Sequence, residues 1–252
     1  IYKTGQIFPV PVLEDMSLAL PTIQPSVFLA VPRVWEKFQA GLLNKINDKT
    51  QSNILPLAVI NSVLADKSSD AKRSFIKRTC QSGNLVRIKN GLYLRAGDLK
   101  DSSYNAFSVA NYIVTPSYVS LESALSFYGL IPEAVYTTTS VTIQKTSSKQ
   151  TPVGLFSFSH LKISYFNFGF YQNKKNNDNY LIATPLKALM DFVVLKGKEY
   201  SSVADMVEDL RFDWDEFVNY KEFVNVEQIN KMLKIYKSYR LQVILKSMKD
   251  YL

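Results

Sequence analysis

A tight β-hairpin is encoded by the stretch LVRIKNGLYL, residues 85–94. Asn90 and Gly91 favour the left-handed backbone of a two-residue turn, and apolar residues alternate with other residues on either side of them. Two cations, Arg87 and Lys89, stand on the first predicted strand. The pattern predicts two short antiparallel strands, which form either a solvated surface turn or a wing that lies on a phosphate backbone.

A basic helix is predicted immediately before the hairpin. Ser68 or Ser69 can cap its start, Asp70 stands in its first turn, and Gly83 can end it. One face is expected to be apolar and to carry Ala71, Phe75, Ile76 and Cys80. The cations are expected to point away from that face: Lys72, Arg73, Lys77 and Arg78.

Two further helices are predicted upstream. The apolar spacing from Trp35 to Asn47 is helical, and Pro56 is placed to start a short helix in the run ILPLAVINSVL. The order helix, helix, basic helix, hairpin is that of a winged helix-turn-helix, which we expect over residues 35–97. Such a helix enters the major groove while the hairpin reaches flanking phosphates. The expected DNA contacts are Lys72, Arg73, Lys77, Arg78, Arg87 and Lys89.

The charge of the chain is basic overall and unevenly distributed. The 252 residues carry a formal charge of +8, which favours an anionic partner, nucleic acid before a membrane surface. Seven cations and no acid lie between residues 72 and 95, whereas eight acids accompany two cations between 205 and 227. Acids this dense on predicted helices form either a solvated face or a magnesium cluster, and the solvated face is favoured.

Composition also restricts the chemistry. The single cysteine, Cys80, excludes an internal disulfide and a cysteine cage for a metal, and it fits a reducing cytoplasm. His160 is the single histidine, so neither a zinc site nor a histidine-assisted nucleophile is expected. We therefore expect no enzymatic activity, no cofactor and no metal site. The apolar runs fall far short of a membrane span, so no membrane partner is expected either.

Residues 98–252 are expected to form a second domain of α+β class, with a mostly antiparallel sheet and C-terminal helices. The stretches YTTTSVTIQ and NYLIAT, and the longer one between them, have the alternation and the composition of β-strands. In TPLKALMDFVVLKG, Thr184 and the following proline start a helix that Gly197 ends. Asp191 on this helix is expected to be buried and to hold the helix to a loop.

The end of the chain is predicted as one helix with a basic side. Cations recur there at every third residue, opposite an apolar side. A solvated basic side and a second set of phosphate contacts are both compatible with this spacing. The residues concerned are Lys231, Lys234, Lys237 and Arg240.

Four segments follow one another in order: GNLVRIKNGLYLRAG, YVSLESALSFYGLIPEAVYTTTSVTIQKT, GLFSFSHLKISYFNFGF and YLIATPLKALMDFV. Together they resemble the AbiEi antitoxins of type IV abortive-infection systems, over about residues 50–252. The resemblance implies a winged helix that binds repeats in its own promoter, and a C-terminal domain that counters a nucleotidyltransferase-like toxin. Lys187 and Asp191 match the family pattern, whereas Leu186 stands where the family usually has an acid, which puts any role of that carboxylate in doubt.

The beginning of the chain has a different resemblance. IQPSVFLAVPRVWEKFQAGL, residues 23–42, is similar to a segment of long-chain acyl-CoA synthetases, the AMP-forming ligases. Adenylation requires a loop of backbone amides and hydroxyls around a triphosphate, and the nine glycines of this chain are scattered. We expect residues 1–34 to be an extension without ligase activity, and not an independent domain, with Pro32-Arg33 as a linker.

The charge pattern and the predicted winged helix, together with the resemblance to AbiEi proteins, lead us to expect a cytoplasmic transcriptional repressor and antitoxin of a phage-defence system. Its expected partners are double-stranded DNA that carries its promoter repeats and a nucleotidyltransferase-like toxin. One alternative is a protein–protein module that binds or modifies a toxin directly, with the winged segment as a dimer surface only. Another is a fusion whose acyl-CoA synthetase remnant retains nucleotide affinity.

Overall fold

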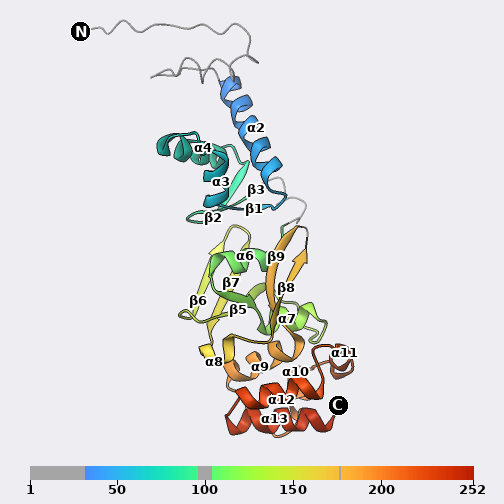
Figure 1. The fold of residues 1–252 in the computed structure, drawn as a ribbon. Coiled ribbons are helices and arrows are strands. Elements are labelled where there is room, and N and C mark those ends of the chain that lie inside the picture. Colours follow the sequence, from blue (N-terminus) through green and yellow to red (C-terminus); the bar gives the residue numbers. More distant parts are fainter. Residues whose placement is uncertain (1–31, 96–103, 176) are drawn as a thin grey trace, which may run out of the picture. The chain divides into compact units, whose positions relative to one another are not determined.

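The computed structural model describes residues 32–95, 104–175 and 177–252, with side chains from residue 40 onward. The chain is of mixed α and β structure (Figure 1). It divides into two units. The first contains Ala58–Gln81 and the described residues up to Gln51, and the second contains Ser52–Leu57 and Ser82–Leu252. The division runs through the segment that we expected as one winged domain, since its helices fall in the first unit and its strands in the second.

The first unit consists of helices. They are α2 (Pro32–Lys49), α3 (Leu57–Val63) and α4 (Ser69–Gln81). Helix α2 is longer than the predicted helix and begins at Pro32, so Pro32-Arg33 is helical, and its expectation as a linker is wrong. The remainder of the expected extension, residues 1–31, lies outside the described residues. The hydroxyl of Ser68, the residue before α4, accepts a hydrogen bond from the Ala71 amide at 3.3 Å. This is the bond that an N-cap residue makes to the first turn of a helix.

A three-stranded antiparallel sheet opens the second unit. Its strands are β1 (Ile54–Pro56), β2 (Leu85–Lys89) and β3 (Leu92–Arg95), in the order β1-β3-β2. The predicted hairpin is present, with Gly91 at φ +78° in its turn. Pro56 ends a strand, and α3 begins only at the next residue, because Ile54 and Leu55 are buried and pair with β3.

A six-stranded sheet forms the centre of the second unit, in the order β6-β7-β5-β4-β9-β8. Its strands are β4 (Ser117–Val119), β5 (Thr137–Thr142), β6 (Ser147–Thr151), β7 (Gly154–His160), β8 (Phe170–Lys175) and β9 (Asp178–Ala183). The pairs β5–β7 and β4–β9 are parallel, and the other three pairs of this sheet are antiparallel. The α+β class and the mostly antiparallel sheet are confirmed, although both parallel pairs lie inside the sheet.

Helices border this sheet and follow it. They are α6 (Ala106–Ile113), α7 (Leu121–Phe127), α8 (Ile163–Phe166), α9 (Pro185–Lys196), α10 (Val203–Leu210), α11 (Trp214–Asn219), α12 (Val226–Ile235) and α13 (Tyr239–Asp250). The predicted limits of α9 are confirmed: the Thr184 hydroxyl caps its start and Gly197 ends it in the left-handed conformation.

The prediction of one continuous C-terminal helix is wrong. The chain leaves the helical conformation at Tyr236 and begins α13 after Ser238, so that α12 and α13 lie side by side (Figure 1). The side-chain amide of Gln242 donates hydrogen bonds to the carbonyls of Leu233 and Tyr236, at 2.8 and 2.5 Å. These bonds satisfy carbonyls that the end of a helix leaves open, which explains how the break is stabilised.

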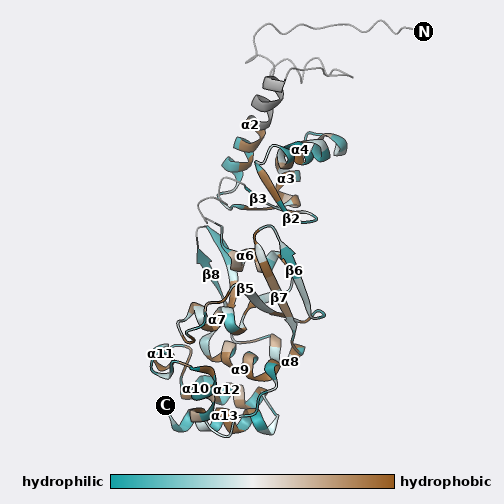
Figure 2. Ribbon diagram, turned by 180° about the vertical axis from the view of Figure 1, so that it is seen from behind, coloured by the Kyte–Doolittle hydropathy of each residue, from teal (hydrophilic) through white to brown (hydrophobic). Residues whose placement is uncertain are grey.

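One core joins the two sheets of the second unit. Ile54, Ile88, Leu92 and Leu94 of the small sheet belong to the same buried cluster as Val109, Ile113 and the large sheet. The inner strand β7 contains the apolar residues Leu155, Phe156 and Phe158, whereas the edge strands β6 and β8 are mostly hydrophilic (Figure 2). Because Ile88, Leu92 and Leu94 lie in this shared cluster, the hairpin packs as part of the second unit.

Candidate functional site

Helix α4 exposes three of its four predicted DNA contacts. Arg73, Lys77 and Arg78 are exposed, and they share the side of the helix that turns to solvent. Lys72 is only half-exposed, because it lies three, four and seven residues before Phe75, Ile76 and Thr79, which are half-buried or buried. The expectation that Lys72 points away from the apolar face is therefore wrong.

The apolar face of α4 also differs by one residue at each end. Ala71 is exposed, and Thr79 is the buried residue of the helix, with its hydroxyl bonded to the Phe75 carbonyl at 2.7 Å. A threonine can be buried in a helix when its hydroxyl bonds back one turn in this way.

The exposed face of α4 carries one acid, Asp70, which lies 3.8 Å from Arg73 with both side chains almost fully in water. Such a pair is weak, so Arg73 can exchange it for a phosphate.

The two cations of the hairpin have different environments. Arg87 is exposed and donates a hydrogen bond to the side-chain oxygen of Asn90 in the turn, which directs the guanidinium along the hairpin tip. The Lys89 ammonium donates to the carbonyl of Ile113 at 2.8 Å, at the C-terminal end of α6. Partial burial lowers the pKa of Lys89 below its ordinary value. Lys89 and Arg87 are both exposed, but the Lys89 ammonium ties the hairpin to the C-terminal end of α6, where a cation complements the helix dipole. Arg87 is bonded within the hairpin.

The four C-terminal cations do not form one basic side, since the helix that was to carry them is broken. Lys231 pairs with Glu227 at 2.8 Å, and Lys234 lies one turn further along α12. Lys237 lies in the break. Arg240 donates to the carbonyls of residues 194 and 198, at 3.3 and 3.5 Å, and so serves to hold α13 against the end of α9.

A buried ion pair occupies the first turns of α9. The Lys187 ammonium and the Asp191 carboxylate are in direct contact, and both side chains are 0% exposed. The ammonium also donates to the Tyr165 carbonyl at 2.6 Å and contacts the Tyr236 hydroxyl at 3.2 Å. The aromatic ring of Phe168 lies 4.7 Å from the same nitrogen, within the range of a cation–π contact.

The carboxylate side of this pair is equally well bonded. Tyr118 and Ser120 donate their hydroxyls to Asp191 at 3.0 and 2.9 Å. Burial raises the pKa of Asp191, and the opposing charge of Lys187 counteracts that shift; burial likewise lowers the pKa of Lys187. Burial and then the Asp191 charge raise the pKa of the Tyr118 phenol, which therefore stays a donor.

This arrangement is a structural tie. The groups are enclosed and bonded to one another, so the pair has no surface from which to reach a substrate. The prediction that Asp191 is buried is confirmed, but it holds its helix to strand β4 and the residue after it, where a loop was expected. Sequence reasoning missed Tyr118, Ser120 and Tyr236; the four-residue spacing of the lysine and the aspartate was the only local signal of the network.

Most acids of residues 205–227 are exposed, and several of them cap helices or bond to neighbouring side chains. The Asp213 carboxylate caps α11 by accepting from the amide of residue 216 at 2.8 Å, and Asp205 accepts from the hydroxyl and amide of Ser201. A hydrogen bond from Lys198, and then one from Tyr200, lower the pKa of Asp209. Within the described ranges, no three His, Cys, Asp or Glu side chains are grouped so that they could hold a metal ion.

Comparison of the sequence with known protein families and with curated proteins finds no match. In the part of the chain that the structure describes, no helix has both the length and the apolar character that a membrane crossing requires.

Proposed function

We propose that this protein is a transcriptional repressor that binds double-stranded DNA through α4 and the β2–β3 hairpin, and that it is the antitoxin of a type IV toxin–antitoxin system. The observation that carries the DNA-binding part is the exposure of Arg73, Lys77 and Arg78 on one side of α4. Phosphate neutralisation by such cations supplies most of the affinity of a DNA-binding protein.

The order of elements supports a winged helix-turn-helix. Helices α2, α3 and α4 are followed by the β2–β3 hairpin, with β1 pairing to it, and α4 is the element with the exposed cations. In this arrangement α4 would be the recognition helix and Arg87 would contact a flanking phosphate. Lys72 and Lys89 would contribute less, because the first is half-buried and the second is bonded to α6.

Fluorescence anisotropy against the protein's own upstream DNA and a scrambled duplex tests the proposal. If Arg73, Lys77, Arg78 and Arg87 each neutralise one phosphate, the slope of log K on log salt should be roughly −4 per chain. Lys77→Gln should weaken binding and reduce the slope by about one unit, whereas Lys149→Gln, an exposed lysine on the edge strand β6, should change neither. Equal affinity for the two duplexes would refute sequence-specific repression, and an unchanged slope for Lys77→Gln would remove α4 from the interface.

The antitoxin role rests on the resemblance to AbiEi proteins in sequence. Co-expression with a nucleotidyltransferase encoded beside the protein, both from unrelated promoters, should restore growth. The Lys77→Gln variant should still restore growth, because neutralisation is assigned to the second unit. Failure of the unaltered protein to restore growth would refute the antitoxin role and leave the DNA-binding proposal standing.

A further inference from the structure

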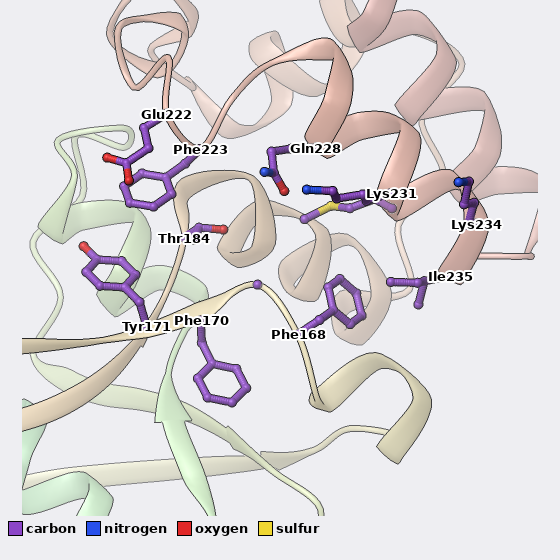
Figure 3. A pocket seen from close by; sticks show the side chains of 12 residues that line it. Phe168, Phe170, Tyr171, Thr184, Glu222, Phe223, Gln228, Lys231, Lys234 and Ile235 are labelled. Carbon is purple, nitrogen blue, oxygen red and sulfur yellow. The ribbon is translucent and has the colours of Figure 1, made fainter.

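A pocket of about 610 Å³ opens in the second unit, between the start of β8 and the helix α12 (Figure 3). Phe168, Tyr171 and Phe223 give it aromatic walls, and Gln228 points into it from α12 (Figure 3). Thr184, at the start of α9, lies on its floor. Pockets that hold small molecules have this size and a mostly apolar lining with a few polar groups.

The aromatic walls are held in place from behind. Phe168 lies against the buried Lys187 ammonium at 4.7 Å and packs edge-on against Tyr236, with ring centres 5.7 Å apart. At the other end, the rings of Tyr171 and Phe223 are stacked at 5.2 Å with 13° between their planes. These contacts fix the rings before any ligand arrives, which lowers the entropic cost of binding.

Gly169 brings this wall close to α9. It has φ +72°, and a Cβ on it would lie 2.9 Å from the Lys187 Cβ. The Thr184 amide donates to the Gly169 carbonyl at 2.8 Å. The strand therefore begins directly on the first turn of α9, and the buried network beneath sets the shape of the pocket.

The charges around the pocket are unequal at its two ends. Lys231 and Lys234, both from α12, line one part, and Glu222 lies at the opposite end beside Tyr171 (Figure 3). Lys231 is paired with Glu227, which leaves its charge largely balanced. Lys234 is exposed and lies at the edge of the pocket, on the same side as Ile235 (Figure 3). An anionic group is thus favoured at the lysine end, with the rest of the ligand on the aromatic walls.

We infer that this pocket binds a small, flat apolar molecule that carries one anionic group. The flat part lies between the aromatic walls, where stacked or edge-on rings attract one another. The anion lies at the mouth near Lys234, and the Gln228 amide supplies a hydrogen bond along the length of the ligand. This site is separate from the proposed DNA contacts and does not depend on them.

The fluorescent dye 1-anilinonaphthalene-8-sulfonate has this chemistry and is the probe for the test. The folded, full-length protein should bind it at one saturable site. Lys234→Glu should weaken its binding about tenfold, since a favourable charge is replaced by a repulsive one. Lys237→Glu, an exposed lysine outside the pocket lining, should change binding less than about twofold. The neutral analogue N-phenyl-1-naphthylamine should bind equally to the unaltered protein and to Lys234→Glu.

A second variant blocks the pocket by bulk. Gln228→Trp changes a half-buried side chain on α12 and should abolish binding of both dyes while circular dichroism shows an unchanged fold. The inference is overturned if the unaltered protein does not bind the charged dye, if Lys234→Glu and Lys237→Glu have equal effects, or if folded Gln228→Trp binds as before.

Discussion

Removal of Asp191 should be among the most damaging single changes in the second unit. Asp191→Ala leaves the Lys187 ammonium enclosed without its counter-charge, and it takes the acceptor away from the hydroxyls of Tyr118 and Ser120. Breaking a buried ion pair from one side typically costs about 3–5 kcal/mol. Since a domain is stable by only about 5–15 kcal/mol, the variant should lose a large share of its free energy of unfolding.

A double-mutant cycle isolates the pair from its surroundings. Lys187→Met alone should also cost about 3–5 kcal/mol, because it leaves the Asp191 carboxylate buried. The variant with Lys187→Met and Asp191→Ala contains neither charge, so its loss should be well below the sum of the two single losses, by about 3 kcal/mol. Ser120→Ala, which removes one hydrogen bond to the carboxylate, should cost about 1.5–3 kcal/mol and serves as a mild variant that remains folded.

Urea unfolding followed by far-ultraviolet circular dichroism measures these free energies. The slope with denaturant should stay constant, since the same surface is exposed on unfolding in every variant. Two results would refute the reasoning. Additive losses in the double variant would mean that the two charges do not stabilise one another. A negligible loss in Asp191→Ala would mean that water reaches the ammonium in the folded protein.

Three further outcomes follow from the structure. Gly169→Ala should destabilise the protein by about 2–4 kcal/mol, since its Cβ would lie 2.9 Å from that of Lys187, whereas Gly129→Ala, at the same φ of +72° with open space around it, should cost about 1 kcal/mol in thermal unfolding. The pKa of Asp209 is lower in the folded protein than its ordinary value of 3.8, so its hydrogen bonds stabilise the fold fully at pH values above 3.8. This stabilisation is lost as the pH falls through the pKa that Asp209 has in the folded protein. Asp209→Asn should therefore lower the urea midpoint at neutral pH, and the difference should vanish in strong acid. Gln242→Ala should cost about 1–3 kcal/mol in urea unfolding and leave α12 more open to amide exchange, because two carbonyls at the helix break lose their donor.

Local signals predicted those parts of the fold that local interactions determine. The hairpin turn at Asn90-Gly91 and the two ends of α9, at Thr184 and Gly197, were predicted correctly. At these positions a residue determines the conformation of its own part of the backbone. The break after α12 was missed, because Tyr236 and its neighbours include neither glycine nor proline and the break is stabilised by a side chain from the next helix. Strand β6, with the sequence SSKQT, was missed because an edge strand with mostly exposed residues lacks apolar alternation.

The sequence identified the cations of the candidate DNA surface, but it could not show which of them are accessible to solvent and which are engaged in other contacts. Lys72 and Lys77 look alike in the sequence, and only their positions relative to the half-buried side of α4 separate them. Lys89 bonds to Ile113, which is 24 residues away, so no local pattern could show that its ammonium is engaged. The pocket beside α12 depends on the approach of β8 to α9 and α12, which spacing along the chain does not encode.

The shared core of the two sheets has a consequence for how this chain can be divided. In a fragment cut after the hairpin, such as residues 35–97, the apolar side chains of Ile88, Leu92 and Leu94 would be exposed, because the core of the large sheet that covers them would be missing. Lys89 would also lose its hydrogen bond to Ile113. Such a fragment should aggregate, even though it contains all the residues of the proposed DNA interface. The hairpin therefore depends on the second unit for its folding. Residues 35–97 could not be exchanged alone for those of a related chain, because the exchanged hairpin would also have to fit the core of the second unit.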